Sequence, residues 1–225
     1  MSRFRKLILS LGAIAVIACM SAKAQADTIN VVGVDSGQFS TATVVCEFNA
    51  QTNTFTFTIT NTSAITTPGS TSTITSIGFD LPPAGNASPS GLNGFTGMQA
   101  PSLSSNFTFS DADLGNVPHG FGSAVLDFGF LTGGSGNFNG GSVNDGLLPG
   151  ESASFTVSCA AFAGFTEEQI CNAIFVRFQN VPLEADSEGS DVGTPGNPIP
   201  EPSSMLLLGS ALIGLGGYVR RRIKR

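Results

Sequence analysis

Histidine is the side chain best suited to acid–base chemistry near neutral pH, and this chain contains a single one, His119. It lies in the segment Val-Pro-His-Gly-Phe, which is typical of a turn. A Ser-His-Asp triad would depend on this residue, but no Gly-x-Ser-x-Gly motif accompanies it. We therefore interpret His119 as an exposed or hydrogen-bonded loop residue.

Paired carboxylates are the other candidate for catalysis, since glycosidases use two of them. Asp80, Asp127 and Glu151 could supply such a pair, but any acidic β domain offers similar pairs. The chain has no Trp, and its one Tyr is Tyr218, so the usual aromatic platforms for stacking sugars are missing. We expect no catalytic activity, with a secreted hydrolase as the second alternative.

Calcium is the cofactor most compatible with this composition, because it prefers several oxygen ligands. Asp111 and Asp113 lie two positions apart near an expected loop, and Asn116, Asp145 and Glu151 could contribute further oxygens. The spacing does not match an EF-hand, since Gly115 falls where a ligand is needed. Asp111 and Asp113 are thus weak calcium candidates; a solvated acidic surface is the simpler interpretation, and we expect no resident cofactor.

Three cysteines remain after the N-terminal apolar segment, which contains Cys19: Cys46, Cys159 and Cys171. In an oxidising compartment two of them are expected to pair, and three pairings exist. We favour Cys159–Cys171, which closes a short loop, over Cys46–Cys159. A zinc site is disfavoured, because the chain has one His and no Cys-x-x-Cys motif.

The C-terminal segment combines three physically different pieces. Pro198, Pro200 and Pro202 keep the backbone extended. Residues 203–219 follow without a charge, and as a helix they would reach roughly 25 Å, near the lower limit for a bilayer core of about 30 Å. Five cationic residues then end the chain: Arg220, Arg221, Arg222, Lys224 and Arg225. The segment predicts a transmembrane anchor with these cations retained in the cytoplasm.

These residues resemble a known family. Pro200-Glu201-Pro202, the short apolar span and the terminal Arg cluster look like the PEP-CTERM sorting signal of Gram-negative bacteria. The resemblance implies that an exosortase in the membrane recognises the Pro-Glu-Pro tripeptide and processes the protein near it during export to the surface or extracellular matrix. The simpler alternative is an ordinary membrane anchor in which the Pro-Glu-Pro tripeptide occurs by chance.

The N-terminus carries a matching export signal. Arg3, Arg5 and Lys6 precede an apolar run from Leu7 to Met20. Small residues at Ala22, Ala24 and Ala26 then offer cleavage sites. We predict a Sec signal peptide over residues 1–26 that is cleaved after Ala26, with Ala24 and Ala26 as the small residues of the site.

Charge is strongly segregated along the chain. Arg177 is the only Lys or Arg between Asp27 and Ile199, whereas fifteen of the sixteen acidic residues lie there. Such an acidic body repels phosphate backbones, which excludes nucleic acid as a partner. The expected partners are the Sec export machinery, exosortase, the membrane through the C-terminal helix, and extracellular polysaccharide.

Period-two alternation predicts β-strands through most of the exported region. In Phe55-Thr-Phe-Thr-Ile-Thr60 the apolar residues fall on one face and the threonines on the other, as in an antiparallel sheet with one wet face. Residues 84–105 and 132–146 are expected to be loops. The predicted strands are 29–34, 41–48, 55–60, 72–81, 107–109, 124–130, 154–159 and 173–179.

One short helix is expected, where Thr166 and Gln169 form a capping box followed by a core strand. Residues 183–199 contain too little apolar surface to pack, so we predict an acidic Gly/Pro linker there. The domain of residues 27–182 is predicted to be an all-β antiparallel β-sandwich, Ig-like or jelly-roll-like, with an up-and-down barrel as the runner-up. Residues 200–225 form the sorting and anchor segment.

The sequence thus predicts an exported structural or interaction protein, sorted by its C-terminal tail and without catalytic activity. After export across the inner membrane and C-terminal anchoring, it would reach the cell surface or extracellular matrix of a Gram-negative bacterium. A calcium- or carbohydrate-dependent adhesion module is the first alternative.

Overall fold

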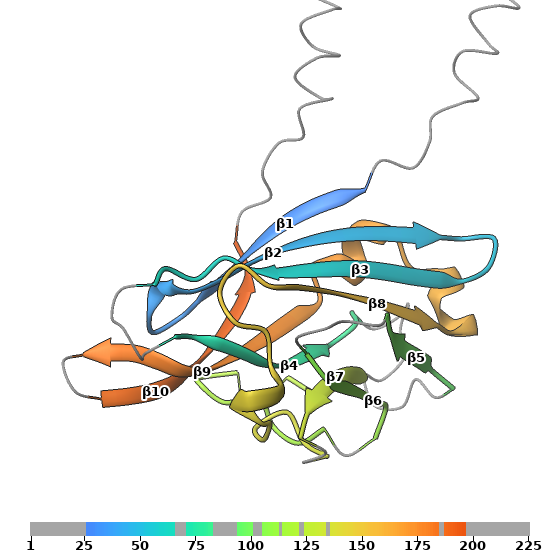
Figure 1. Cartoon of the computed structure of the whole chain (residues 1–225). Coiled ribbons are helices and arrows are strands. Elements are labelled where there is room, and N and C mark those ends of the chain that lie inside the picture. The colour runs from blue at the N-terminus through green and yellow to red at the C-terminus, as the bar shows by residue number, and fades with distance from the viewer. Residues whose placement is uncertain are drawn as a thin grey trace, which may run out of the picture.

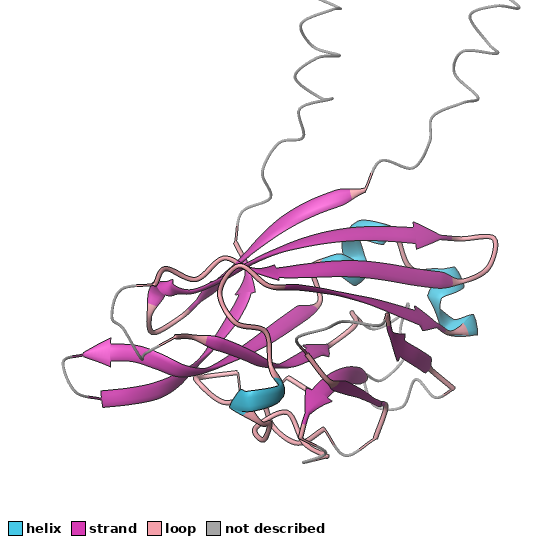
Figure 2. Cartoon of the chain, viewed as in Figure 1, coloured by secondary structure: helices cyan, strands magenta, loops and turns pink. Residues whose placement is uncertain are grey.

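The computed structural model describes residues 26–65, 71–82, 94–100, 105–112, 114–121, 124–133, 136–184 and 187–196. These residues form β-strands with very little helix (Figures 1 and 2). The strands are β1 Asp27–Gly33, β2 Gly37–Asn49, β3 Thr54–Asn61, β4 Thr73–Phe79, β5 Thr96–Gln99, β6 Phe107–Ser110, β7 Phe128–Thr132, β8 Ser152–Ser158, β9 Ile174–Glu184 and β10 Ser187–Pro195. Between them lie the 3-10 helices η1 Val143–Asp145 and η2 Ala160–Gly164 and the α-helix α2 Glu167–Cys171.

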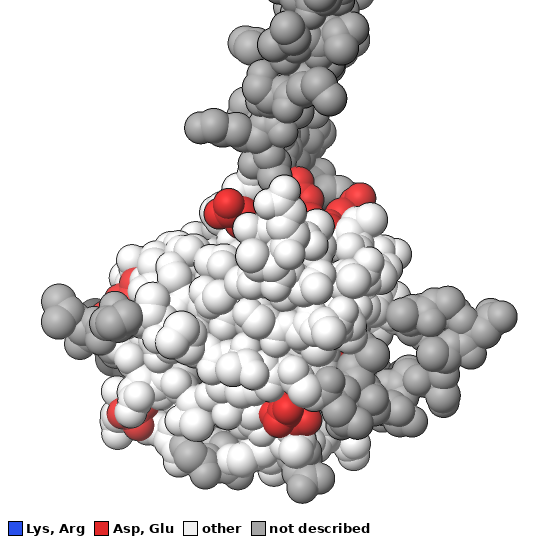
Figure 3. Space-filling model, turned by 90° about the vertical axis from the view of Figure 1, so that its right-hand side faces the viewer, with Lys and Arg blue, Asp and Glu red and all other residues white. Residues whose placement is uncertain are grey.

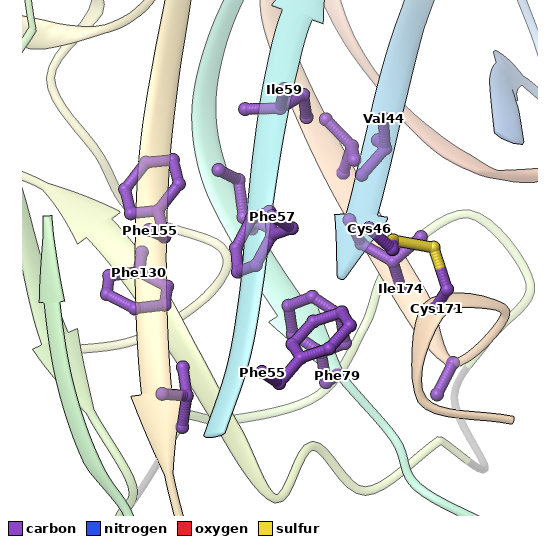
Figure 4. Packing of buried hydrophobic residues seen from close by; sticks show 14 of the residues in the cluster. Val44, Cys46, Phe55, Phe57, Ile59, Phe79, Phe130, Phe155, Cys171 and Ile174 are labelled. Carbon is purple, nitrogen blue, oxygen red and sulfur yellow. A yellow bond between two sulfur atoms is a disulfide. The ribbon is translucent and has the colours of Figure 1, made fainter. Parts of the chain in front are cut away.

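All ten strands belong to one antiparallel sheet in the order β5-β8-β3-β2-β1-β10-β9-β4-β7-β6. The sheet bends over itself, so that β3 and β8 lie across from β4 and β7 (Figure 1). The rings of Phe57 on β3 and Phe79 on β4 meet edge to face with centroids 5.1 Å apart, and Phe57 also contacts Phe130 on β7. Figure 4 shows this phenylalanine-rich core between the two layers.

The two end strands of the sheet, β5 and β6, are joined through side chains. The Gln99 side chain accepts a hydrogen bond from the Phe107 backbone N–H at 2.8 Å and donates one to Ser105 Oγ at 2.9 Å. Gly97 faces the ring of Phe109, and a Cβ at that position would come within 2.1 Å of it. The sheet is therefore nearly closed and barrel-like.

The predicted all-β antiparallel class is confirmed. The two packed layers are halves of one continuous sheet, however, and not the two separate sheets that the sandwich prediction implied. Aromatic contacts across the core explain the folding over, because the rings on β3 are buried only when another layer covers them. Within the loop predicted for residues 84–105, the structure places β5.

The prediction of a linker over residues 183–199 is wrong for much of that segment. Ser187–Pro195 forms β10, a central strand between β1 and β9. Apolar alternation failed as a signal, because Val192 is the only apolar residue of the strand that packs in a hydrophobic cluster. The strand is held by backbone pairing on both sides and by close packing, since a Cβ on Gly193 would come within 2.6 Å of Val31.

A second hydrophobic cluster covers the outer face of β9 and β10. Val192 packs there beside Phe138, and Phe121 meets Phe175 of β9 edge to face with centroids 5.3 Å apart. The segment that carries Phe121 also carries His119, so this cluster brings the single histidine to the surface of β10.

The predicted capping box and short helix are confirmed. The Thr166 hydroxyl accepts a hydrogen bond from the Gln169 N–H, and the Gln169 side chain accepts one from the Thr166 N–H. Glu167 then docks the helix on the strand ends, because its carboxylate accepts hydrogen bonds from Phe48 N at 2.6 Å and Asp27 N at 3.3 Å.

The position of α2 also determines which cysteines form the disulfide. The structure pairs Cys46 on β2 with Cys171 at the end of α2, with Cα atoms 6.2 Å apart (Figure 4). The predicted Cys159–Cys171 bridge is therefore wrong. Loop length favoured that pairing, but Glu167 positions α2 against the ends of β1 and β2, which brings Cys171 to Cys46. Cys159 is buried in the core and takes no part in the bridge.

None of the helices within the described ranges has both the length and the apolar character needed to cross a membrane. The predicted transmembrane segment of residues 203–219 and nearly all of the signal peptide lie outside those ranges. Ala26 is the first described residue and directly precedes β1, so cleavage after Ala26 stays a prediction.

Candidate functional site

The turn between β1 and β2 is fixed by one buried carboxylate from a distant strand. Asp191 of β10 is fully buried, and it accepts hydrogen bonds from Asp35 N at 3.2 Å, Ser36 N at 2.9 Å and Ser36 Oγ at 2.5 Å. The backbone N–H of its neighbour Val192 is the fourth donor, at 2.7 Å. A carboxylate with four donors is well compensated for its burial, so Asp191 acts as an anchor for the turn.

Close packing around Asp191 explains why residue 33 is a glycine. A Cβ on Gly33 would come within 2.1 Å of Asp191 Oδ2 and 2.6 Å of the Ser40 Cβ. Ser40 is itself buried and forms a 2.6 Å hydrogen bond with Ser36 Oγ. Gly33 therefore leaves the space that the Asp191 carboxylate occupies.

The same turn presents Asp35 to the single histidine. His119 Nδ1 lies 2.5 Å from Asp35 Oδ2, and its other ring nitrogen, Nε2, lies 3.4 Å from Ser190 Oγ. The His119 side chain is 20% exposed and that of Asp35 54% exposed, so solvent reaches the group. We call Ser190, His119 and Asp35 the relay cluster, because the imidazole connects the hydroxyl with the carboxylate.

Backbone irregularities surround this cluster. Ser190 pairs with Gln179 and Gly189 with Val181, which leaves Asn180 as an extra residue of a β-bulge in β9. Asn180 has a φ of 57° and His119 a φ of 60°, both in the left-handed region that few non-glycine residues adopt. Bulges and strained backbone are concentrated at functional sites, where they redirect side chains.

The relay cluster can perform two kinds of chemistry. A histidine between a carboxylate and a serine is the arrangement that activates a nucleophilic hydroxyl. Ligand atoms of Asp35, His119 and Asp191 also lie within 4.8 Å of one another, as in a metal site. The four hydrogen bonds to Asp191 already use the lone pairs that a metal would need, so the arrangement fits the first kind better.

This cluster could hardly be predicted from sequence. His119 is a hydrogen-bonded turn residue, as interpreted from the sequence, whereas Ser190 lies in the segment predicted as a linker and Asp35 in a turn without a recognisable motif. No local motif links them, because three distant segments meet only through the position of β10 in the sheet. The only local indication was of the turn between β1 and β2, which contains Gly33, Asp35 and Gly37.

Of the carboxylates considered for a glycosidase pair, Asp80 and Asp127 lie close enough to interact through their charges. Burial raises the pKa of Asp127 to about 6, against the lowering effect of a hydrogen bond from Leu81 N at 2.8 Å; the nearby charge of Asp80 raises it further. Burial also raises the pKa of Asp80, while a backbone hydrogen bond from Val125 opposes the rise. Glu151 instead accepts a hydrogen bond from Leu148 N within its own turn.

Only one of the two calcium candidates lies within the described residues, so that call stays a prediction. Asp111 is exposed, and Asp113 lies outside the described residues. Within the described ranges, Asp35, His119 and Asp191 are the only group of three or more potential metal-ligating side chains. The Asn116 carbonyl, another candidate, accepts a hydrogen bond from Asn139 Nδ2 at 2.8 Å.

The outer side of β3 and β8 forms a continuous row of hydroxyls. Cross-strand pairs join Thr58 to Ser154 and Thr60 to Ser152 at 2.7 Å each, while two further pairs are longer. β2 continues the row, with Thr43 in register with Thr60. We define the hydroxyl face by these side chains: Thr54, Thr56, Thr58, Thr60, Ser152, Ser154, Thr156 and Ser158.

This face carries no charge, although the domain is strongly acidic. Glu47 of β2 lies at its border, in register with Thr56. Figure 3 shows one side of the molecule with a few separate acidic patches, no Lys or Arg, and a largely uncharged surface between them. Arg177 on β9 is the one basic residue of the described part; burial lowers the pKa of its guanidinium, and its Nε has no hydrogen-bond partner there.

The structure does not describe the sorting residues Pro200, Glu201 and Pro202 or the terminal cations from Arg220 onward. Residues 198–222 match the model of the PEP-CTERM protein-sorting motif. The chain thus carries a PEP-CTERM tail, as the resemblance predicted, behind a described part that is all-β, and the motif implies export and processing by exosortase. Comparisons with curated proteins and with solved structures found no significant match.

Proposed function

We propose that the mature protein is a surface- or matrix-associated interaction protein, delivered outside the cell by its PEP-CTERM tail. The match of residues 198–222 to the sorting motif is the observation that carries this proposal. Pro200, Glu201 and Pro202 are the recognition residues, and the cations that follow the apolar segment keep the chain in the membrane until it is processed. The disulfide fits delivery to an oxidising compartment.

The proposal treats the β domain as the part that is delivered. The domain is acidic and disulfide-bonded, and its charge keeps it soluble outside the cell.

Mass spectrometry of the protein from its native cell tests this function. We expect a mature form that begins at Asp27 and ends near Pro200, found at the cell surface or in the matrix. Glu201→Ala should leave an intact C-terminus ending at Arg225, retained in the inner membrane. Export and C-terminal loss that are equal in the wild-type and Glu201→Ala proteins would contradict the proposal.

The hydroxyl face favours adhesion to neutral polysaccharide as a second candidate function. Its donors and acceptors are regularly spaced, and the absence of charge avoids the desolvation that an acidic surface would require. Exposed Met98, on the neighbouring strand β5, adds apolar surface at its edge.

Pull-down on cellulose and on dextran resin, with and without EDTA, measures this second function. Thr58→Lys should reduce retention at least about tenfold. When the polysaccharide lies on the hydroxyl face, this lysine would be buried without a charged partner, which opposes binding. Gln38→Lys, an exposed change on β2 away from the face, makes the same charge change and should leave retention unchanged. Equal retention of both variants would exclude the hydroxyl face, and loss with EDTA would indicate calcium dependence.

A further inference from the structure

We propose that Ser190 is a nucleophile, activated by His119 and oriented through Asp35, and that the domain hydrolyses small uncharged esters. This activity goes beyond the sorting function and is independent of it. It also replaces the expectation, made from the sequence, that the domain has no catalytic activity.

The geometry around the imidazole is that of an activated hydroxyl. With its proton on Nδ1, His119 donates to Asp35 Oδ2 at 2.5 Å and leaves Nε2 as the acceptor that faces Ser190 Oγ at 3.4 Å. Nucleophile and base commonly lie this far apart before substrate binds, and a third group that orients the base completes the arrangement. The carboxylate fixes the tautomer and stabilises the imidazolium that forms.

Each member of the relay cluster is held by structure outside it. Asp191 accepts hydrogen bonds from the backbone of Asp35 and Ser36, which fixes the turn, and Ser190 directly precedes Asp191 on β10. The bulge at Asn180 lies opposite Ser190. His119 follows Pro118 in a turn whose next residues pack on β9 through Phe121. Such support is what a working site requires of its scaffold.

The reaction balances with water as the only co-reactant. Ser190 Oγ forms a bond to the acyl carbon while His119 Nε2 takes the hydroxyl proton; that proton then passes to the departing alkoxide as the ester C–O bond breaks. Water attacks the acyl-serine, His119 Nε2 takes its proton, and return of the proton to Ser190 releases the carboxylic acid.

Charge and exposure set the substrate class. The carboxylates of Asp35 and Asp191 lie at the cluster, and the only ion pair of the described residues is the one between His119 and Asp35. No guanidinium or ammonium is paired there to hold a substrate carboxylate or phosphate. Because two carboxylates lie at the cluster, uncharged esters fit it better than anionic ones, and solvent exposure of His119 and Asp35 lets a small ester reach it.

A fluorophosphonate probe and p-nitrophenyl acetate test the proposal on the full-length protein in detergent. We expect one labelled serine, located at Ser190 by peptide mass spectrometry. Ser190→Ala should abolish labelling, and His119→Gln should slow both labelling and hydrolysis about 100-fold. Asp35→Asn should slow both at least about tenfold and change their pH profile, because it removes the charge that stabilises the imidazolium.

Ser110→Ala is the matched control, since Ser110 is a strand serine on β6, outside the relay cluster and the hydroxyl face, whose hydroxyl donates to the Ala112 carbonyl. It should label and hydrolyse like the wild type. Circular dichroism melting of each variant separates loss of fold from loss of activity. Labelling that persists in Ser190→Ala, or that is absent from a folded wild type, overturns the proposal. Activity that requires an added divalent ion and disappears with EDTA also overturns it, in favour of a metal centre at Asp35, His119 and Asp191.

Discussion

At the scale of single residues, burial of carboxyl groups has opposite consequences at two places in this domain. Asp191 is fully buried but accepts four hydrogen bonds, which compensate its charged form. Asp127 is nearly as buried and accepts a backbone hydrogen bond from Leu81. Its ionised form is therefore poorly compensated, which agrees with the raised pKa.

The raised pKa of Asp127 predicts a loss of stability as pH rises. The pKa is about 6 in the folded protein and 3.8 as the ordinary value, so between these values the folded state binds more protons than the unfolded state. The free energy of unfolding then falls as pH increases through this window. We expect this group to cost about 1–3 kcal/mol at pH 7 relative to pH 4.

Urea unfolding of the wild type and Asp127→Asn at pH 4 and pH 7 measures this effect. The amide keeps an acceptor for Leu81 N but cannot ionise. The variant should therefore gain stability relative to the wild type on going from pH 4 to pH 7. Glu168→Gln, an exposed change, serves as the control and should show no such gain. If the free energy of unfolding differs between the wild type and Asp127→Asn by the same amount at both pH values, the raised pKa is refuted.

At the scale of elements, the helix α2 links a late part of the chain to the first two strands. Its capping box starts it, Glu167 bonds the backbone of β1 and β2, and Cys171 at its end forms the disulfide with β2. A helix of this length is not stable alone, so these contacts hold it in place. The helix in turn closes one end of the core between the layers.

The disulfide should contribute strongly to stability, because it spans 125 residues of the chain. In the chain-entropy account a loop of this length corresponds to roughly 4–5 kcal/mol, and removal of native bridges costs about 2–5 kcal/mol. We expect Cys46→Ser/Cys171→Ser to lower the free energy of unfolding by about that amount. Guanidinium unfolding under non-reducing conditions measures it.

Peptide mapping without reductant provides the control for this prediction. It should find Cys46 linked to Cys171 in the wild type and in Cys159→Ala alike. A bridge between Cys159 and Cys171 would show that the chain follows the shorter loop after all. Reductant should lower the stability of Cys159→Ala but not that of the double serine variant.

At the scale of the whole molecule, the predictable features are those that each segment specifies by itself. Alternation in β3, where Phe55, Phe57 and Ile59 point inward, was sufficient to predict a strand, its face and the wet side that became the hydroxyl face. The capping box was likewise complete within four residues. The sorting tail is also local, which explains why it was recognised from sequence.

Features that depend on long-range pairing could not be predicted in this way. β10 contains few apolar residues and becomes a strand because β1 and β9 pair with it from both sides. The relay cluster depends on β10, since Ser190 and Asp191 meet the β1–β2 turn only when that strand is in place. The disulfide depends on where α2 docks. The wrong linker, the wrong disulfide and the cluster that no pattern predicted all depend on contacts between segments far apart in sequence.

The position of β10 gives a sharp prediction about the domain boundary. A chain of residues 27–182, the boundary predicted from sequence, lacks the strand that joins β1 to β9 and leaves two unpaired strand edges in the middle of the sheet. It also removes the carboxylate that holds the β1–β2 turn. We expect this shorter chain to aggregate or to melt without a cooperative transition, because exposed edges pair with other chains. A chain of residues 27–196, which retains β10 and ends before the sorting motif, is the matched control and should melt cooperatively as a monomer in circular dichroism and size-exclusion experiments. If both chains melt cooperatively at the same temperature, β10 is dispensable and residues 183–199 act as the linker that their composition suggests.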